Sequence, residues 1–353
     1  MKIAVYGCGA MGTILGAYLT KNGYDVDMVD INKPHIAALR EKGATILGYG
    51  NFTTPVHAIF PEEMANAYDL IILLTKRTAN PVVLPFLKTK LSEKGVVCTM
   101  QNGVPEPSVA EIIGADKTIG GAIKWAATFV EPGVSKVTTN LDRKVEQHSS
   151  FFDIGEVSGF ITPRIKQVAD ILSCMGYTQI FDRLTDARWT KLVVNSCCSG
   201  MSASLGCTFG EATTNPRSLD CVRGIAYEVA VVSMAAGVHI DPPYLQLLLR
   251  EKDCKTYFHN HYLTGGNGKA SMLQDLEAGR LTEVDMLNGQ VCKTGRELGI
   301  PTPYNDTVVK IVHDIEAGKL PLSTDNLRFF PEIHYEDRIL EGFDNRNAIR
   351  DEV

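Results

Sequence analysis

Residues 2–12 read KIAVYGCGAMG, and this stretch decides the fold of the first half of the chain. Its apolar, β-prone start predicts a buried strand, and the glycines that follow form the pattern G-x-G-x-x-G. In this pattern Gly7 permits a tight turn, Gly9 lets a pyrophosphate approach the backbone, and Gly12 lets the next helix pack closely. The helix N-terminus then offers N–H groups to phosphates. We therefore predict a dinucleotide-binding loop made by Gly7, Cys8, Gly9, Ala10, Met11 and Gly12.

A glycine-rich turn can also be purely structural. The acidic residue at the end of the second strand is the further evidence for dinucleotide binding. Asp30 ends that strand, close to the position about 20 residues on where a carboxylate binds the ribose 2′-hydroxyl. A carboxylate there repels a 2′-phosphate and favours NAD over NADP, although Lys33 is near enough to compensate. The alternative role of Asp30 is to cap the helix that begins near Lys33.

Strand and helix patterns alternate as far as residue 181. The predicted strands are 2–6, 25–29, 70–75, 96–100 and 178–181, and the predicted helices are 10–21 (amphipathic), 33–42, 82–91 and 165–175. This alternation predicts an α/β Rossmann-type doubly wound sheet, parallel and covered on both faces. Residues 117–139 are β-rich, and we expect them to add antiparallel strands to the edge of the sheet.

After Asp182 only helical periodicity remains. The predicted helices are 187–204, 219–236, 243–257, 282–298 and 305–317, which together predict an all-α C-terminal domain. We place a dinucleotide-binding Rossmann domain at 1–183, a helical substrate and catalytic domain at 184–320, and a C-terminal tail at 321–353. The tail is rich in Pro, Asp, Asn and Arg, so we expect it to wrap the surface or fray.

Composition excludes several function classes. With 44% hydrophobic and 22% charged residues the chain is ordinary globular protein, and its net charge of -6 argues against a nucleic-acid partner. Nine cysteines form no CxxC pair, which indicates reduced thiols and a cytoplasmic protein. We see no signal peptide, and no apolar run approaches the roughly 20 residues that span a bilayer. His259 and His261 have no further ligand pattern nearby, so we expect no metal.

One apolar helix bears on the oligomeric state. The long helix at 219–236 suits a homodimer interface and a buried core equally well. The sequence leaves that choice open.

The start of the helical half carries the first catalytic candidates. Lys191, Asn195 and Ser199 are spaced four apart, so they would share one face of a helix that is otherwise largely apolar. Desolvation lowers the pKa of a lysine, which suits proton donation near neutral pH. The alternative is that Lys191 extends its amine to the surface.

Two later segments are ambiguous by themselves. Ser271 precedes an apolar run and could be a helix N-cap, and residues 282–285, Thr-Glu-Val-Asp, could be the acidic first turn of a helix. These two segments indicate a function only when they are considered together with the remaining motifs.

Taken together and in their order along the chain, the motifs of residues 1–318 resemble those of the ketopantoate reductase family. Besides the glycine loop, the resemblance rests on Lys76, on Gln101-Asn102-Gly103, on Trp189-x-Lys191-Leu192-x-x-Asn195, on Ser271-Met272-Leu273-Gln274-Asp275 and on Thr282-Glu283-Val284-Asp285-x-x-Asn288-Gly289. The resemblance implies NAD(P)H-dependent reduction of a 2-oxo acid to a 2-hydroxy acid, with 2-dehydropantoate reduced to pantoate as the first choice.

The resemblance also assigns roles to residues. Lys191 would protonate the carbonyl oxygen, and Glu283 would orient Lys191 and contact substrate and cofactor. Asn195 and Ser271 would bind the substrate, and Ser199 stands where the family usually has a second asparagine. The remaining contacts, to the nicotinamide ribose side, would come from Lys76 and from Asn102, which also borders the substrate.

Departures from the family pattern widen the range of substrates. Besides Ser199, this chain has Ile123-Lys124-Trp125 where many members have a polar run, which suggests a larger or more apolar pocket. A bulkier 2-oxo acid is therefore an alternative substrate. Two further hypotheses are a β-hydroxyacid or opine-type dehydrogenase, and a sensor that binds NAD without turnover.

Overall fold

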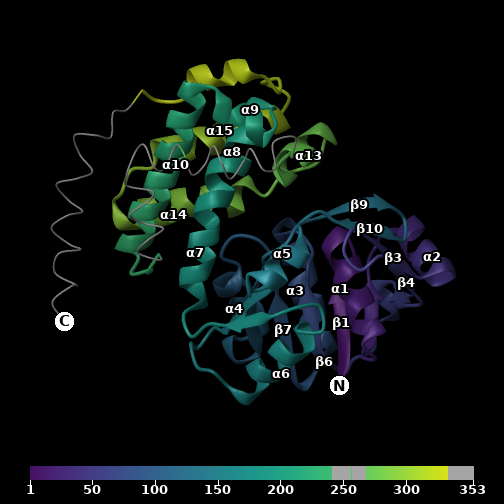
Figure 1. The fold of residues 1–353 in the computed structure, drawn as a ribbon. Helices are drawn as coiled ribbons and strands as arrows, with labels where there is room; N and C mark the ends of the chain where they lie inside the picture. The colour runs from purple at the N-terminus through teal and green to yellow at the C-terminus, as the bar shows by residue number, and fades with distance from the viewer. Residues whose placement is uncertain (241–255, 257–267, 333–353) are drawn as a thin grey trace. The chain divides into compact units, whose positions relative to one another are not determined.

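In the computed structural model, the glycine loop joins strand β1 (Lys2–Tyr6) to helix α1 (Ala10–Lys21) at the centre of a large sheet (Figure 1). The structure describes residues 1–240, 256 and 268–332. The chain divides into two units, Met1–Ala187 and Arg188–Val353. We call them the first and the second unit.

The main sheet of the first unit has eight strands. In spatial order they are β12 (Thr178–Ile180), β11 (Phe152–Glu156), β8 (Thr118–Ile123), β7 (Leu91–Thr99), β6 (Tyr68–Leu73), β1, β2 (Asp25–Val29) and β5 (His57–Ile59). Neighbouring strands are parallel except β8 and β11, which are antiparallel. The chain leaves β1 for β2 on one side and reaches β6 on the other, so the strand order reverses between β1 and β6. In open α/β sheets such a reversal opens a ligand crevice at the carboxyl ends of the strands.

Helices cover both faces of this sheet. One apolar core joins the sheet to α1, α2 (Lys33–Lys42) and α6 (Pro163–Leu172), and a second core joins the opposite face to α3 (Asn80–Lys90) and α4 (Glu106–Ile113). Successive strand residues alternate between the cores: Ile3 and Val5 face one, Ala4 and Tyr6 the other. The predicted doubly wound sheet is confirmed.

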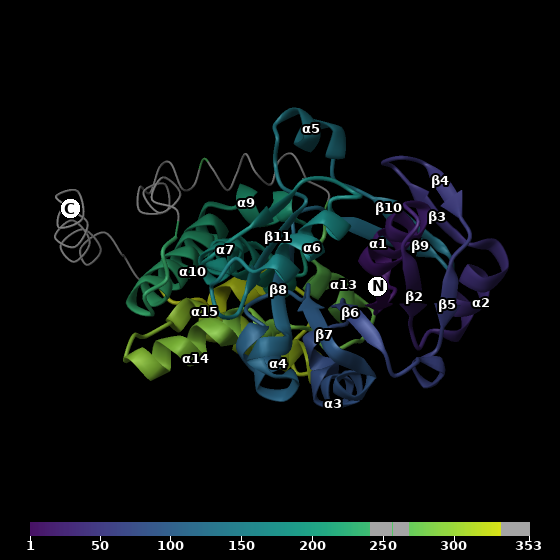
Figure 2. The ribbon, with the colours of Figure 1, turned by 90° about the horizontal axis from the view of Figure 1, so that it is seen from below.

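Helix α1 is buried on all sides. Its residues 12–19 are all buried, which corrects the expectation of an amphipathic helix. The reason is a second sheet, with the order β4 (Phe52–Thr54), β3 (Ala44–Leu47), β10 (Val134–Val137) and β9 (Ala127–Glu131). All four of its strands contact α1, and both views show this sheet beside the helix (Figure 2).

The second sheet also corrects the prediction for residues 117–139. Strand β8 joins the main sheet parallel to β7, rather than adding an antiparallel strand on that side. Strands β9 and β10 do not extend the main sheet, because β10 pairs with β3 across a long stretch of sequence, Val134 opposite Thr45. A short helix, α5 (Leu141–Glu146), follows β10.

In the described part of the second unit the regular structure is helical, as predicted. The helices are α7 (Leu184–Val194, which begins in the first unit), α8 (Gly200–Leu205), α9 (Phe209–Thr214), α10 (Pro216–Ala235), α13 (Ser271–Glu277), α14 (Asn288–Leu298) and α15 (Pro303–Glu316). The predicted helix at 243–257 lies, except for residue 256, outside the described residues. Among the described helices, none combines the length and the apolar character needed to cross a membrane.

Helix α10, the candidate for a dimer interface, packs within its own unit. It contacts α8, α9, α14 and α15, and residues such as Val222, Ile225 and Val229 are fully buried. Its apolar character is therefore explained by the core of the second unit.

The described start of the tail packs on the surface of the second unit. Arg217 of α10 donates to the carbonyl oxygens of Phe330 and Pro331, at 3.0 and 2.8 Å. Asn326 is buried and donates to the carbonyl of Ser204 at 3.0 Å. These bonds hold residues 326–331 against the helices of the second unit.

A buried polar network holds the core of the second unit together. The carboxylate of Glu228 on α10 accepts the N–H groups of Tyr304 and Asn305, at 2.8 and 2.9 Å, and so caps the N-terminus of α15. Asn305 Nδ2 also donates to Glu228 at 2.8 Å, and Asn305 Oδ1 accepts from Asn288 Nδ2 at 2.9 Å. Asn288 Nδ2 lies 3.1 Å from the carbonyl oxygen of Ser196 as well. The network therefore links three helices to the segment that follows α7.

We expect Glu228→Gln to destabilise the second unit by about 1.5–3 kcal/mol, because one charged acceptor of a buried N–H is lost. The chain has two tryptophans, Trp125 in the first unit and Trp189 in the second. Denaturant unfolding followed by Trp189 fluorescence in a Trp125→Phe background therefore reports on the second unit.

The matched control is Glu297→Gln on α14, whose carboxylate is 61% exposed and 4.0 Å from Lys293. A pair of this kind contributes less than about 1 kcal/mol. Equal unfolding midpoints for the two variants would contradict the capping role of Glu228.

Candidate functional site

The glycine loop lies where the strand order reverses, and its close contacts leave room for side chains at only one glycine. Gly7 has φ +98°, and a Cβ there would lie 2.7 Å from the amide nitrogen of Thr75. A Cβ on Gly12 would lie 2.2 Å from the carbonyl oxygen of Gly7. A Cβ on Gly9, by contrast, would meet nothing within 4 Å. Gly9 thus faces open space, as a loop that admits a pyrophosphate requires.

The loop fits an anionic ligand. Helix α1 has Gly9 as its N-cap, with no side-chain cap and no acidic residue in the first turn, so Ala10, Met11 and Gly12 present backbone N–H groups. At the same crevice Thr75 Oγ1 is buried and has no hydrogen-bond partner among the described residues. These donors suit the phosphates of a dinucleotide.

The side chain of Cys8 does not face the crevice. Its thiol is fully buried, donates to the carbonyl oxygen of Val5 at 3.3 Å, and has a pKa that burial raises. The side chain therefore belongs to the core beneath the loop.

Asp30 is half-buried at the end of β2, beside the loop. Its Oδ1 accepts the N–H of Asn32 at 2.9 Å, and it is Asn32 that caps α2, by accepting the N–H of His35. The alternative role of Asp30 as the helix cap is therefore wrong, and its carboxylate stands beside the cap at the carboxyl end of the strand.

Lys76 and Asn102 follow the carboxyl ends of β6 and β7, so the first unit brings them to the same edge as the glycine loop and Asp30. The buried amide of Gln101 cross-links these two strand ends, since its Nε2 donates to the carbonyl of Thr75 at 2.8 Å. Gln101 and Asn80 also exchange two amide hydrogen bonds, at 2.7 and 3.0 Å. In the sequence Gln101 belongs to a motif, but no pattern there predicts this structural role.

The catalytic candidates of the second unit lie on an irregular helix. Lys191 is on α7, and Asn195 to Ser199 form a π-helical segment that leads into α8. A π-helical turn holds more residues than an α-helical turn, so Asn195 and Ser199 do not keep the α-helical spacing that the sequence predicts. All three residues are half-buried. The segment is held from below by Asn288, through the carbonyl of Ser196.

The cysteines of the π-helical segment point into the core. Cys197 and Cys198 are buried, and Cys197 Sγ lies 2.6 Å from the carbonyl oxygen of Val193. Burial raises the pKa of Cys197. Both are small residues buried on a helical segment.

In the second unit Ser271 begins helix α13, and Glu283 lies in the segment that follows this helix. Ser271 is the exposed first residue of α13, whose N-cap is Ala270, so the N-cap alternative for Ser271 is wrong. Helix α13 packs against the π-helical segment, which brings Ser271's helix to Asn195 and Ser199. Glu283 is buried and precedes a short 3-10 turn (Val284–Met286).

The predicted helix 282–298 is therefore broken, and α14 begins only at Asn288. The break follows from a clamp on residues 282–285. Glu316 of α15 accepts the N–H of Thr282 at 2.7 Å, and His313 of α15 contacts Asp285 at 2.9 Å. These bonds fix the segment that carries Glu283.

The departures from the family pattern have structural explanations. Trp125 is 4% exposed and packs edge-on against Phe152, with ring centroids 6.1 Å apart, so it is a core residue of the first unit. Lys124 lies 3.3 Å from the buried carboxylate of Asp153. The ammonium group of Lys124 is thus paired with a carboxylate of the protein. His259 and His261 lie outside the described residues.

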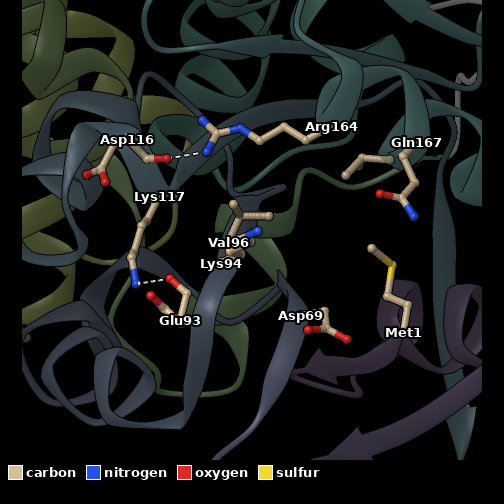
Figure 3. A pocket seen from close by; sticks show the side chains of 10 residues that line it. Met1, Asp69, Glu93, Lys94, Val96, Asp116, Lys117, Arg164 and Gln167 are labelled. Carbon is tan, nitrogen blue, oxygen red and sulfur yellow. Dashed lines mark hydrogen bonds between the residues drawn. The ribbon is translucent and has the colours of Figure 1, made fainter.

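A separate cavity of about 530 Å³ lies at the opposite, amino-terminal edge of the main sheet (Figure 3). Three of its charged side chains bind the protein itself, those of Asp69, Lys117 and Arg164. Lys117 Nζ donates to the carbonyl of Glu93 at 2.9 Å, and Arg164 donates to the carbonyl of Asp116. Asp69 accepts the N–H of Lys2 at 2.9 Å. We assign this cavity no ligand.

Comparison with solved structures shows the class of the fold. A 2-dehydropantoate 2-reductase from Geobacter metallireducens superimposes with a TM-score of 0.76 at 26% identity, over 89% of this chain and 99% of that one. A D-mandelate dehydrogenase in complex with NADH superimposes with a TM-score of 0.75 at 25% identity, over 90% and 99%. Both of these proteins are oxidoreductases, and this chain shares their fold.

Comparison of sequences then shows the family. Residues 3–150 match the family model of ketopantoate reductase PanE/ApbA, and residues 183–316 match that of its C-terminal part. The 2-dehydropantoate 2-reductase of Streptococcus pyogenes is 29% identical over 320 residues, 90% of this chain and 98% of that protein. The chain belongs to the ketopantoate reductase family.

We expect Gly9→Ala and Gly12→Ala to separate binding from folding. Gly9 has an extended backbone conformation, with φ -64° and ψ -154°, and space for a Cβ, so Gly9→Ala should change the unfolding temperature far less than Gly12→Ala does. The added methyl should nevertheless raise the Kd for a dinucleotide at least about tenfold. Gly12→Ala should destabilise the fold itself, by about 1–3 kcal/mol.

Thermal unfolding and fluorescence titration with NADH and NADPH measure the two effects. A Gly9→Ala protein that binds both dinucleotides as tightly as the natural chain would contradict the assignment of the loop.

We expect the clamp of His313 to strengthen as the pH falls. Partial burial lowers the pKa of His313, but hydrogen bonds to Asp285 and Glu316 outweigh it and raise the pKa above its usual value. Both ring nitrogens lie 2.9 Å from a carboxylate oxygen, and carboxylates only accept, so the ring is an imidazolium. Its contribution is full below the unfolded pKa of about 6.5 and is lost as the pH rises through the raised folded pKa.

Denaturant unfolding of the natural chain and His313→Gln at about pH 6 and about pH 9 measures this contribution. Because the ring is 45% exposed, we expect a difference of at most about 1 kcal/mol at the lower pH and none at the higher. A difference that grows with pH would refute the imidazolium clamp.

Proposed function

We propose that the chain catalyses NAD(P)H-dependent reduction of a 2-oxo acid to a 2-hydroxy acid, with 2-dehydropantoate as the substrate and pantoate as the product. The observation that carries the proposal is the match of both units to the ketopantoate reductase family. The relatives from Streptococcus pyogenes and Archaeoglobus fulgidus, both 2-dehydropantoate 2-reductases, match over 90% of this chain.

The first unit would hold the nicotinamide cofactor, and the second would act on the substrate, as the domains predicted at 1–183 and 184–320 imply. The glycine loop would bind the pyrophosphate and Asp30 the adenosine ribose, while Lys76 and Asn102 would lie on the nicotinamide side. The open space at Gly9 supports this assignment, as does Thr75 Oγ1, which is buried without a partner among the described residues.

The cofactor, when bound, supplies the hydride. Addition of hydride to a ketone places negative charge on the carbonyl oxygen, so a cationic donor beside that oxygen stabilises the transition state more than the ground state. We assign this proton donor to Lys191. Glu283, on its clamped segment, would orient Lys191 and also contact substrate and cofactor. Its burial supports a positioning function, because a buried carboxylate requires a partner.

The substrate itself would be held by side chains around the π-helical segment. Asn195 would hydrogen-bond the substrate, Ser271 would bind its carboxylate, and Ser199 would replace a family asparagine with a shorter donor. The packing of α13 on the π-helical segment supports a shared function for these residues. π-Helical turns are frequent at functional sites.

For the cofactor we propose a preference for NADH over NADPH. Asp30 would accept the ribose hydroxyls and repel a 2′-phosphate, and its position beside the cap of α2 keeps the carboxylate at the end of β2. Lys33 is exposed in the first turn of α2 and reduces the preference.

A second candidate function is reduction of a bulkier 2-oxo acid by the same mechanism. The observation that favours it is the similarity to a D-mandelate dehydrogenase, since mandelate carries an aromatic side chain.

We expect Lys191→Ala to lower kcat by about 10²- to 10⁴-fold while the Kd of NADH is unchanged, because the change removes the proton donor but no cofactor contact. The assay is oxidation of NADH and NADPH with 2-dehydropantoate and with branched and aromatic 2-oxo acids. Lys293→Ala on α14, whose side chain is 69% exposed, is the control and should match the natural chain.

The outcomes separate the candidate functions. Turnover only with bulky acids would favour the second candidate, and undiminished turnover in Lys191→Ala would refute its role. Binding of NADH without turnover of any substrate would instead indicate a sensor that binds NAD.

A further inference from the structure

A histidine that the proposed function does not use lies directly behind the glycine loop. His35 of α2 is 1% exposed. Its Nε2 lies 3.0 Å from Thr13 Oγ1 of α1, and its Nδ1 accepts the N–H of Gly133, in the turn between β9 and β10, at 2.9 Å. Thr13 Oγ1 in turn donates to the carbonyl oxygen of Cys8 at 2.8 Å.

The directions of these bonds fix the state of the ring. A backbone N–H only donates, so Nδ1 of His35 carries no proton, and the proton of the neutral ring must be on Nε2. Nε2–H then donates to Thr13, whose own hydroxyl proton is left to bond Cys8. The relay runs from Gly133 through His35 and Thr13 to the glycine loop.

The relay ends on the peptide group that faces the proposed ligand. The carbonyl of Cys8 and the N–H of Gly9 belong to one planar trans peptide, so they point in opposite directions. Because Thr13 holds the carbonyl of Cys8 on its own side of the peptide, the N–H of Gly9 points to the opposite side, away from Thr13. Gly9 is the loop residue that faces open space.

We propose that His35, as the neutral Nε2–H tautomer, is a positioning residue for dinucleotide binding, which acts through Thr13 on the Cys8–Gly9 peptide. The inference rests on the proposed function of the glycine loop. It also gives the second sheet a function, because the turn that carries Gly133 selects the tautomer.

The surroundings of the ring keep it neutral. Burial lowers the pKa of His35, and this outweighs Asp30 at the end of β2 and the carbonyl of Cys8, both of which raise it. Three uncharged groups also contact the ring: Thr13 from α1, Gly133 from the turn, and the ring of Phe129 from β9, at a centroid distance of 5.1 Å. Protonation of Nδ1 would place two donors against each other and release the turn.

The first test compares His35→Phe with the natural chain in fluorescence titrations with NADH and NADPH and in steady-state kinetics. Loss of the relay should raise Kd about tenfold, equivalent to roughly 1.4 kcal/mol. The kcat at saturating cofactor and the KM for the 2-oxo acid should not change. The matched control is Tyr68→Phe, which removes a buried hydrogen bond to Asp27 at the amino-terminal edge of the sheet and should leave Kd unchanged.

The second test uses the middle of the relay and does not depend on the folding of His35→Phe. Thr13→Val lacks the hydroxyl and should reproduce the rise in Kd, whereas Thr13→Ser keeps it and should bind as the natural chain does. If Thr13→Val and Thr13→Ser bind equally, the relay does not position the loop.

The third test is the pH profile of binding, which a merely structural histidine would not alter. We use NAD⁺ as the probe, because a 2′-phosphate itself titrates near pH 6. The natural chain should lose affinity as the pH falls below the usual histidine pKa of about 6.5 toward the lowered one, and Thr13→Val should show a flatter profile.

The outcomes distinguish the inference from the proposed function. If the natural chain binds neither dinucleotide, the proposed function is wrong. If it binds and His35→Phe binds equally well with lower thermal stability, His35 is structural only and the inference is overturned.

Discussion

The first unit depends on the close approach between the start of α1 and the end of β1. Only a glycine at position 12 lets the helix begin against the carbonyl of Gly7, and this contact sets the helix against the sheet. Because α1 is then enclosed by the main sheet and by β3, β4, β9 and β10, the loop at its N-terminus is held from two sides. A loop fixed in this way loses little conformational entropy when a ligand binds.

In the second unit, polar groups rather than close backbone packing hold the candidate residues in place. The carboxylate of Glu228 and the amides of Asn305 and Asn288 form a chain of buried hydrogen bonds that ends beneath the π-helical segment. Apolar packing alone would tolerate a helix that slides or rotates, whereas directional bonds select one arrangement. Both units thus place their candidate groups on backbone that is fixed by contacts behind it.

The sequence predicted those parts of the fold that depend on local pattern. The glycine loop, the alternation of strands and helices up to residue 181, and the helices around 219–236 and 305–317 were all visible in periodicity and turn residues. The pairing of β10 with β3 was not visible, because it joins segments far apart in the chain and each segment alone looks like an edge strand. Strands β3, β4 and β5 were missed because each has only three or four residues, too few to show an alternating pattern.

The candidate site was predicted to a similar degree. Spacing made Lys191 and Asn195 candidates and the family resemblance added Glu283, but neither the π-helical turn nor the break before α14 leaves a pattern in the sequence. Gln101 and His35 were not assigned their contacts, since a single buried polar residue is recognised only by its partners. Family resemblance supplied roles where spacing alone left alternatives, and those roles stay predictions until they are measured.

The burial of the cysteines determines how the protein responds to thiol reagents. Cys8 lies in the glycine loop and Cys197 in the π-helical segment, yet both thiols are fully buried, and burial raises the pKa of each. Thiolates are the reactive form, so alkylation at these positions requires that the core first open. Inactivation by such a reagent through Cys8 or Cys197 would therefore be a measure of local unfolding, and a ligand bound at the glycine loop would slow the reaction of Cys8 without touching its sulfur.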